Sequence, residues 1–191
     1  KYIESKKRGE KLDSKVMKWK GDFIICFRSH FILPKKLIDK AKIAAINFHP
    51  APPEYPGSGC INFALYNEDK TYGVTAHLMN EKVDNGEILE VRRFSINRSD
   101  NLSNLLNKTH KELFSLCISF LNSISKEGKD FLTKKIEESK EIKWNGKARR
   151  LQELEDLQTV DVKVGKKELE KIIRATYIKE FPPRIVLHGF T

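Results

Sequence analysis

The sequence of 191 residues predicts an α/β fold in which a central sheet is flanked by helices, followed by a small C-terminal arm. Two observations predict this fold. Short apolar runs alternate with segments of helical period, and one apolar run leads directly into a loop rich in proline and glycine. The hydrophobic fraction of 39% is sufficient for a core, and the length suits one domain with an appendage.

Two buried strands are predicted in the first part of the chain. Residues 22–27 and 44–48 are short apolar runs that are typical of fully buried strands. Between them, Pro34 suits the start of a helix over residues 35–41, because the first helical amide needs no partner. The second strand leads into the loop over residues 50–59, and α/β folds place ligands at such strand ends.

Two further strands are predicted after a short helix over residues 61–66. They cover residues 71–79 and 87–96, and the turn at Asp84-Asn85-Gly86 separates them. Ser99 can then cap a long helix in which leucines and other apolar residues recur near the helical period. A helix with one apolar stripe is expected to cover the sheet.

The C-terminal part has a weaker pattern. Residues 126–144 are strongly charged and predict no clear element, whereas a helix is expected over residues 167–177 and a short strand over residues 185–187. The change of pattern near residue 140 predicts a main domain over residues 1–140. Residues 141–191 then form a small α+β arm, which we interpret as a candidate dimerisation element.

Composition excludes several classes of protein. No apolar run approaches the roughly 18 residues of a membrane span, and the polar, lysine-rich start is not typical of a secretory signal. Cys26, Cys60 and Cys117 are far apart and lack CxxC spacing, which argues against a disulfide framework or a zinc site. We therefore expect a cytoplasmic protein with no metal.

The formal net charge of +10 raises the alternative of nucleic-acid binding, because basic patches attract phosphates. The charge is concentrated at the two ends of the main domain, with +5 on residues 1–20 and +4 on residues 126–150. Residues 21–125 together carry only +1. We therefore interpret most of the charge as solvated surface and do not expect nucleic acid to be the partner.

The candidate chemistry lies between residues 46 and 89. Asn47 and His49 are two apart on a predicted strand, so their side chains share a face, and the turn at Asp84 can bring a carboxylate to the same cleft. An amide, an imidazole and a carboxylate suit acyl transfer to an amine, because they stabilise an oxyanion and move a proton. On spacing alone the pattern is not specific, because a lone histidine is more often structural.

Four segments occur in this region in a characteristic order: Asn47-Phe48-His49-Pro50, Pro53-Glu54-Tyr55-Pro56-Gly57-Ser58-Gly59, Gly73-Val74-Thr75-Ala76-His77 and Val83-Asp84-Asn85-Gly86-Glu87-Ile88. Together they resemble the formyltransferases that use 10-formyltetrahydrofolate, a family that includes glycinamide ribonucleotide, methionyl-tRNA and sugar-nucleotide members. The resemblance covers about residues 20 to 125. It implies a Rossmann-like sheet, a folate formyl donor, and Asn47, His49 and Asp84 as catalytic residues.

The resemblance also implies binding residues. The segment FRSHFILP over residues 27–34 is similar to the one whose backbone cradles the pterin, so Phe27, Ile32 and Leu33 become candidate folate contacts together with Asp84. His77, Tyr55 and Gly57 become candidate contacts of the acceptor. For His77 the alternative is a half-buried strand histidine that is only satisfied locally.

Two other side chains are expected to play no part in the chemistry. Cys60 lies near the proposed cleft, but no basic neighbour in the sequence lowers the pKa of its thiol, so it is not expected to be a nucleophile. Trp144 is interpreted as a packing or dimer contact.

Within the family, three details favour a small-molecule acceptor. His77 follows Gly-Val-Thr-Ala, as in the nucleotide and sugar members, and the loop over residues 49–60 looks most like that of the sugar enzymes. The C-terminal arm is too short for the tRNA-binding barrel of the tRNA enzymes. We therefore expect an amino-sugar nucleotide as acceptor and a homodimeric protein.

The family pattern also has about two βα units before the segment equivalent to residue 22, so the chain is expected to be N-terminally incomplete. Two alternatives follow. One is a methionyl-tRNA formyltransferase-like or other RNA-binding protein that uses its basic ends, and the other is an inactive truncated homologue that acts as a scaffold.

Overall fold

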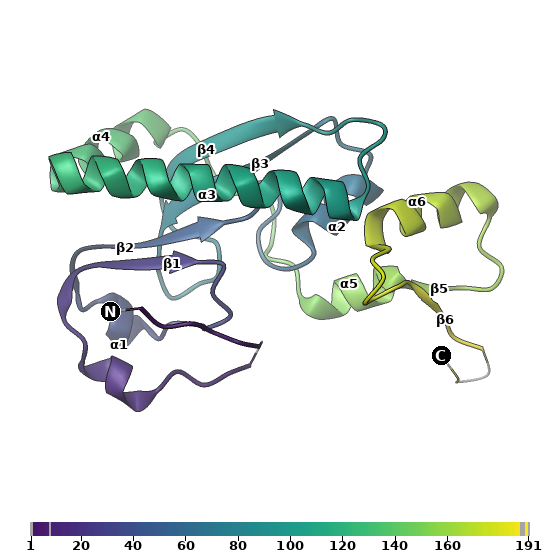
Figure 1. Ribbon diagram of the computed structural model, residues 1–191, viewed down its shortest axis with the longest axis horizontal. Helices are drawn as coiled ribbons and strands as arrows, with labels where there is room; N and C mark the ends of the chain where they lie inside the picture. The colour runs from purple at the N-terminus through teal and green to yellow at the C-terminus, as the bar shows by residue number, and fades with distance from the viewer. Residues whose placement is uncertain (1, 8, 188–189, 191) are drawn as a thin grey trace.

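The computed structural model describes residues 2–7, 9–187 and 190. After a 3₁₀ turn at Ser14–Lys18, the chain forms a four-stranded sheet with the order β1-β2-β3-β4 (Figure 1). Strands β1 (Gly21–Phe27) and β2 (Ala41–His49) are parallel. Strands β3 (Thr71–Leu78) and β4 (Ile88–Ser95) follow in antiparallel register. This mixed sheet with flanking helices confirms the predicted α/β fold.

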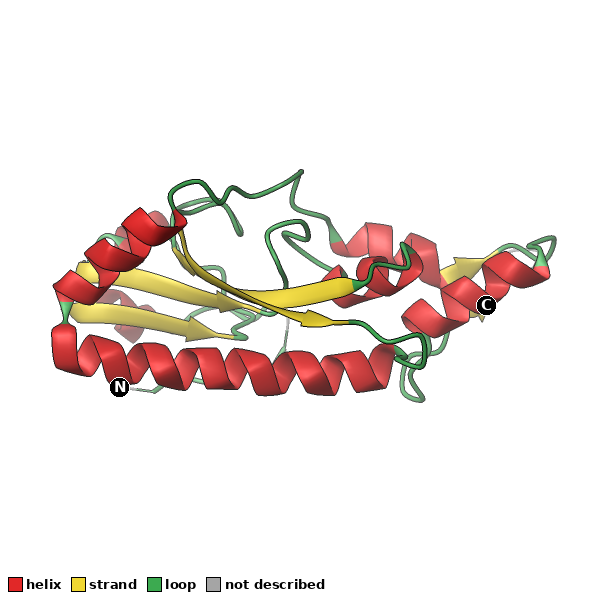
Figure 2. Cartoon of the chain, turned by 90° about the horizontal axis from the view of Figure 1, so that it is seen from above, coloured by secondary structure: helices red, strands yellow, loops and turns green. Residues whose placement is uncertain are grey.

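Helix α3 (Leu102–Glu127) covers one face of the sheet, and α4 (Lys129–Ser139) packs against both α3 and β4 (Figure 2). The main core lies between α3 and the sheet. Its fully buried large side chains each contribute about 1.5–3 kcal/mol, and they are Ile46, Phe48, Val74, Leu89, Leu113, Leu116 and Phe120. The core therefore fixes β2 and β3, the two strands that lead into the candidate site.

A second core joins the C-terminal part to the sheet. Helix α2 (Cys60–Tyr66) packs against α6 (Lys166–Thr176), and the Asn62 side chain donates to the Ala175 carbonyl oxygen at 2.8 Å. Between them in sequence, α5 (Leu151–Gln158) precedes β5 (Thr159–Val160). The arm is thus attached to the main sheet through α2.

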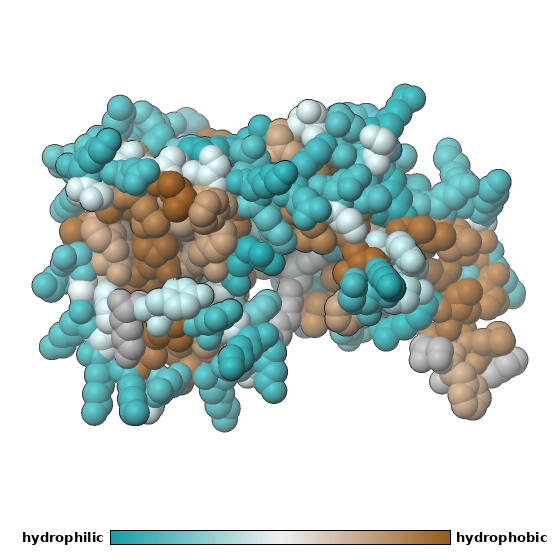
Figure 3. Space-filling view, viewed as in Figure 1, coloured by the Kyte–Doolittle hydropathy of each residue, from teal (hydrophilic) through white to brown (hydrophobic). Residues whose placement is uncertain are grey.

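The arm also contains a small parallel sheet, in which β5 pairs with β6 (Arg184–Ile185). Figure 3 shows apolar side chains gathered around this end of the arm and again over β1 below α3. The division of the chain near residue 140 and the dimer stay predictions. In the described part of the chain, every helix is too short or too polar to span a bilayer.

Several element boundaries differ from the predicted ones. Helix α1 (Lys35–Ile38) is a single turn, because Ala41 already belongs to β2. The cap of α3 is Asn101, whose side chain accepts a hydrogen bond from the Asn104 amide at 3.0 Å, whereas Ser99 lies in the preceding turn. Helix α4 was not expected, because its few apolar residues stand among lysines and glutamates.

Candidate active site

The ends of β2 and β3 bring three of the predicted polar residues together. In the antiparallel register of these strands Asn47 lies opposite His77, and His49 follows two residues later on the same strand. Asp84 lies in the turn between β3 and β4 with a φ of 43°, a conformation that aspartate tolerates better than most residues. The predicted meeting of Asn47, His49 and Asp84 is therefore seen in the structure.

His49 is buried between two oxygen acceptors. Its Nδ1 atom lies 3.3 Å from Asp84 Oδ2, and its Nε2–H donates to the Tyr55 carbonyl oxygen at 2.9 Å. Burial lowers the pKa of His49, and the negative charge of Asp84 opposes this shift. Because each ring nitrogen faces an oxygen, the protonated ring is the form that satisfies both contacts.

Asp84 is held by donors from three elements. Its Oδ2 accepts the backbone N–H of Gly57 at 2.9 Å, and its Oδ1 accepts a long hydrogen bond from Asn47 Nδ2 at 3.4 Å. Burial raises the pKa of Asp84, but the charge of His49 and hydrogen bonds from His77 and Gly57 hold it below its ordinary value. The carboxylate is therefore charged at neutral pH.

His77 is a buried member of the same network. Its Nδ1–H donates to the Leu78 carbonyl oxygen at 2.7 Å. Its Nε2 lies between the Asn47 amide nitrogen at 3.1 Å and Asp84 Oδ1 at 3.4 Å. A neutral His77 accepts from Asn47 at this position and a protonated one donates to Asp84, so the ring orients the amide that was predicted to be catalytic.

Position 57 strongly favours glycine. Its φ is 90°, and an added Cβ would lie 2.4 Å from the Arg149 carbonyl oxygen. Two backbone hydrogen bonds cause this close approach: the Ser58 amide donates to Arg149 and the Arg149 amide donates to Pro56. The glycine thus allows the loop to place an N–H group against Asp84.

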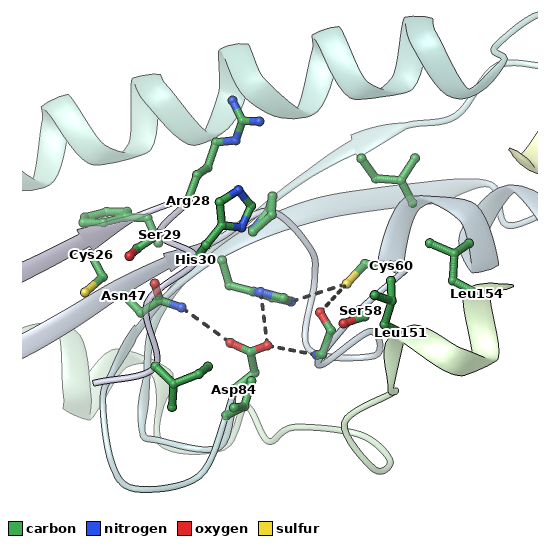
Figure 4. A pocket seen from close by; sticks show the side chains of 18 of the residues that line it. Cys26, Arg28, Ser29, His30, Asn47, Ser58, Cys60, Asp84, Leu151 and Leu154 are labelled. Atoms are coloured by element: carbon green, nitrogen blue, oxygen red, sulfur yellow. Dashed lines mark hydrogen bonds and ion pairs between the residues drawn. The ribbon is translucent and has the colours of Figure 1, made fainter. Parts of the chain in front are cut away.

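These residues line one side of a cleft of about 790 Å³ (Figure 4). Opposite them, the segment from Arg28 to Leu33 forms an exposed wall, and the predicted folate contacts Ile32 and Leu33 lie there. Leu151 and Leu154 of α5 extend the lining at the end near Cys60 (Figure 4). Asn47, His49, Gly57, His77 and Asp84 are all part of the lining.

Two predicted contact residues are not part of the lining as far as the structure is described. Side chains alternate along a strand, so Cys26 faces the cleft while the Phe27 ring packs against Phe114 of α3, with 6.4 Å between centroids. The Tyr55 side chain is buried, and its hydroxyl donates to Asp69 at 2.6 Å. The contribution of Tyr55 to the site is its carbonyl group, which holds His49.

The contacts of two residues with the histidines of the site were missed from the sequence. Trp144 contacts both histidine rings, although it stands alone in a charged segment that carries no motif. Cys60 Sγ lies 3.9 Å from His49 Nε2, so its basic neighbour is supplied by the fold and not by the sequence. In the described ranges, no group of three or more His, Cys, Asp or Glu side chains is arranged to hold a metal ion.

The sequence is similar to that of known formyltransferases. The family profile described as formyl transferase matches residues 1–121. The methionyl-tRNA formyltransferase of Ehrlichia ruminantium (strain Gardel) is 33% identical over 122 residues, which are 63% of this chain and 40% of that protein. The corresponding enzyme of Wigglesworthia glossinidia brevipalpis is 34% identical over 61% of this chain and 37% of its own length. The chain thus spans about two fifths of the length of these curated relatives.

Solved structures share the fold. A 4-N formyltransferase from Francisella tularensis superposes with a TM-score of 0.71 at 22% identity, covering 89% of this chain and 67% of that one. The formyltransferase PseJ from Anoxybacillus kamchatkensis was solved in complex with UDP-4,6-dideoxy-4-formamido-L-AltNAc and tetrahydrofolate. It superposes with a TM-score of 0.62 at 24% identity, covering 77% of this chain and 74% of that one.

Proposed function

The chain belongs to the formyl transferase family, and on this basis we propose that it moves a formyl group from 10-formyltetrahydrofolate to the primary amine of an amino-sugar nucleotide. The observation that carries the proposal is the buried cluster of Asn47, His49 and Asp84 on one side of the cleft. Such a cluster combines a neutral donor, a cationic donor and a carboxylate, which are the groups that formyl transfer to nitrogen requires.

The cleft fits a folate donor in size and in chemistry. Its volume of about 790 Å³ lies within the range of small-molecule sites, roughly 300–1,000 Å³. Apolar side chains such as Ile32, Leu33 and Met79 also line it. When bound, the donor supplies a formyl carbon that is open to attack by an amine.

Each residue of the cluster has its own role in the proposed reaction. The Asn47–Asp84 hydrogen bond is long, at 3.4 Å, and we expect the Asn47 N–H to exchange it for the formyl oxygen. The Nε2–H of protonated His49, which donates to the Tyr55 carbonyl oxygen in the structure, is the second donor to the formyl oxygen, where negative charge develops. The charge of Asp84 favours the protonated form of His49, and Asp84 receives the proton of the attacking amine through a water molecule. The tetrahedral intermediate then collapses: the bond between the formyl carbon and N10 of the folate breaks, and N10 leaves with the proton that Asp84 returns through the same water.

The acceptor is the finer part of the proposal. An amino-sugar nucleotide is supported by the fold likeness to a 4-N formyltransferase and to an enzyme solved with a formamido-sugar nucleotide. Methionyl-tRNA is the second candidate, because the curated relatives with 33% and 34% identity are methionyl-tRNA formyltransferases. The basic segments 1–20 and 126–150 would then contact phosphates.

One assay separates these acceptors. The purified protein is incubated with 10-formyltetrahydrofolate and either a panel of amino-sugar nucleotides or methionyl-tRNA, and the products are identified by mass spectrometry. We expect a formamido-sugar nucleotide. Formylation of methionyl-tRNA alone would favour the second candidate. A protein that binds a folate analogue in a thermal-shift assay but formylates no acceptor would contradict the proposed activity and favour the scaffold alternative.

The cytoplasmic location and the homodimer stay predictions. Sedimentation of the purified protein tests the dimer directly, since a monomer at micromolar concentration would contradict it.

A further inference from the structure

The segment over residues 140–150 lies outside the part of the chain that the family profile matches, yet it is fixed to the candidate site. Its backbone runs along the loop over residues 53–58. The Asn145 amide donates to the Pro53 carbonyl at 2.9 Å, and the Arg149 amide donates to the Pro56 carbonyl at 3.1 Å. The same loop carries the Gly57 N–H that binds Asp84, so the segment and the site are held by one set of contacts.

Trp144 is the side chain by which this segment reaches the histidines. Its ring meets His77 edge to face at 88°, with 5.0 Å between centroids, and meets His49 at 66° and 5.7 Å. Its Nε1–H donates to the Gly86 carbonyl oxygen at 2.7 Å, in the turn that carries Asp84. Trp144 is half-buried, and in the described part of the chain it is not among the residues that line the cleft.

We propose that Trp144 is a positioning residue for the proposed formyl transfer, which fixes the rotation of both imidazole rings and keeps water from the side of the rings that faces away from the cleft. The catalytic part of this inference rests on the proposed function. The hydrogen bond from Trp144 to Gly86 supports this role, because it ties the indole to the same turn that places Asp84.

The direction of the effect follows from the groups around His49. Asp84 faces it from the turn, His77 from β3 and Cys60 from α2, and the indole of Trp144 adds no charge. Removing Trp144 therefore admits water without changing the charges. Because burial lowers the pKa of His49, hydration raises it.

Three variants test the proposal. Trp144→Leu removes the ring, Trp144→Phe keeps an aromatic edge but loses the hydrogen bond to Gly86, and Trp19→Phe is the matched control. Trp19 is also half-buried, but it packs on the backbone near Gly21, in the N-terminal segment. The sequence has two tryptophans, so the control removes the other one.

The first readout is independent of activity. The histidine side chains are titrated by NMR, with His30 and His110 as internal references. In Trp144→Leu we expect the titration of His49 to move upward by roughly half a pH unit or more, with a smaller movement in Trp144→Phe and none in Trp19→Phe. The second readout is kinetic: kcat falls about tenfold in Trp144→Leu at nearly constant KM, and its pH profile moves with His49.

Each outcome of these measurements either supports or overturns the proposal. An unchanged His49 titration in Trp144→Leu, or an equal change in Trp19→Phe, overturns the proposal. A lower melting temperature with an unmoved pH profile would mean a structural role only, and would also overturn it. If Trp144→Leu does not fold, Trp144→Phe carries the same test. If the wild-type protein formylates no acceptor, the proposed function fails, while the NMR titration still decides the role of Trp144.

Discussion

The two walls of the cleft are built in different ways. On one wall the residues His49, His77 and Asp84 are only 4%, 2% and 7% exposed, and protein atoms accept or donate hydrogen bonds at each of them. On the other wall Ile32 is 73% exposed, and the backbone of His30 is held by a hydrogen bond from its amide to the Ser5 side chain. The first wall is anchored in the sheet, and the second is a surface loop.

From this difference we expect the buried wall to serve the chemistry and the exposed wall to serve recognition. Buried donors that are held in place before substrate arrives stabilise developing charge without reorganisation, and the polar wall has this property. A surface loop with few internal hydrogen bonds can adjust its conformation to a ligand. We therefore expect the exposed wall, and not the buried one, to determine which ligands bind. Substitutions on the first wall should therefore lower kcat, and those on the second should raise KM.

The largest effect is expected for His49→Ala. In the proposed reaction His49 is the cationic donor to the oxyanion, so its loss should lower kcat by about 10²-fold or more. His30→Ala is the matched control, because His30 lines the opposite, exposed wall of the same cleft. Steady-state formyl transfer measures both. Equal losses in the two variants would show that the walls do not differ in the way described.

The next effect is expected for Asp84→Asn, which keeps the left-handed backbone because asparagine also tolerates a φ of 43°. The charge of Asp84 raises the pKa of His49, so its removal lowers that pKa and the ring loses its proton at a lower pH. We expect kcat to fall about tenfold or more at neutral pH, and the alkaline limb of its pH profile to move to lower pH.

The control for this variant is Asp39→Asn, which changes an exposed carboxylate that pairs with Lys35 outside the cleft. It should leave the profile unchanged. A pH profile in Asp84→Asn that coincides with the wild-type profile would contradict the role given to Asp84.

A smaller effect, on stability, compares two glycines of nearly equal φ. Gly57 has a φ of 90° and its added Cβ would collide with the Arg149 backbone, whereas Gly146 has a φ of 89° and open space around it. Both alanine variants carry the backbone strain, of about 1–3 kcal/mol, but only Gly57→Ala carries the collision. Urea unfolding should therefore show a larger loss of unfolding free energy for Gly57→Ala.

Gly57→Ala should also lower kcat, because the collision moves the N–H group that binds Asp84. If the two alanine variants are equally stable and equally active, then the contact between the loop and the segment over residues 140–150 does not shape the site.

The smallest effect is expected on the exposed wall. Ile32→Ser removes apolar surface from the proposed donor site and should raise KM for 10-formyltetrahydrofolate about fivefold, which corresponds to ~1 kcal/mol of apolar contact, with kcat nearly unchanged. Ile43→Ser alters an exposed isoleucine that does not belong to the described lining and should change neither constant. A fall in kcat without a change in KM for Ile32→Ser would place this residue in the chemistry.

The sequence predicted most strands and the long helix, because their apolar periods are set by burial against the sheet. The prediction of element boundaries from the sequence failed where two local signals compete. Ser99 and Asn101 are both good capping residues, and the turn made by Asn97 and Asp100 decides between them. Helix α4 is stabilised by a small apolar face that packs against α3 and β4. The many charged residues around this face obscure its helical period in the sequence.

The site was predictable where its residues lie in motifs. Asn47, His49 and Asp84 are of this kind, because the first two share strand β2 and the turn after β3 brings Asp84 to them. Trp144 and Cys60 were not, because they reach His49 only through the folding of a later segment and of the loop before α2. Phe27 does not belong to the described lining of the cleft, because side chains alternate along β1 and its neighbour Cys26 faces the cleft.

The most direct test follows the formyl carbon itself. The wild-type protein, in excess over 10-formyltetrahydrofolate labelled with ¹³C in the formyl group, is mixed with an amino-sugar nucleotide, and the label is followed by NMR in a single turnover. We predict that the label moves from the folate to the amine of the acceptor as a formamide. Label that stays on the folate, or appears only as formate, with every acceptor in the panel would contradict a formyl transfer carried by His49 and its neighbours.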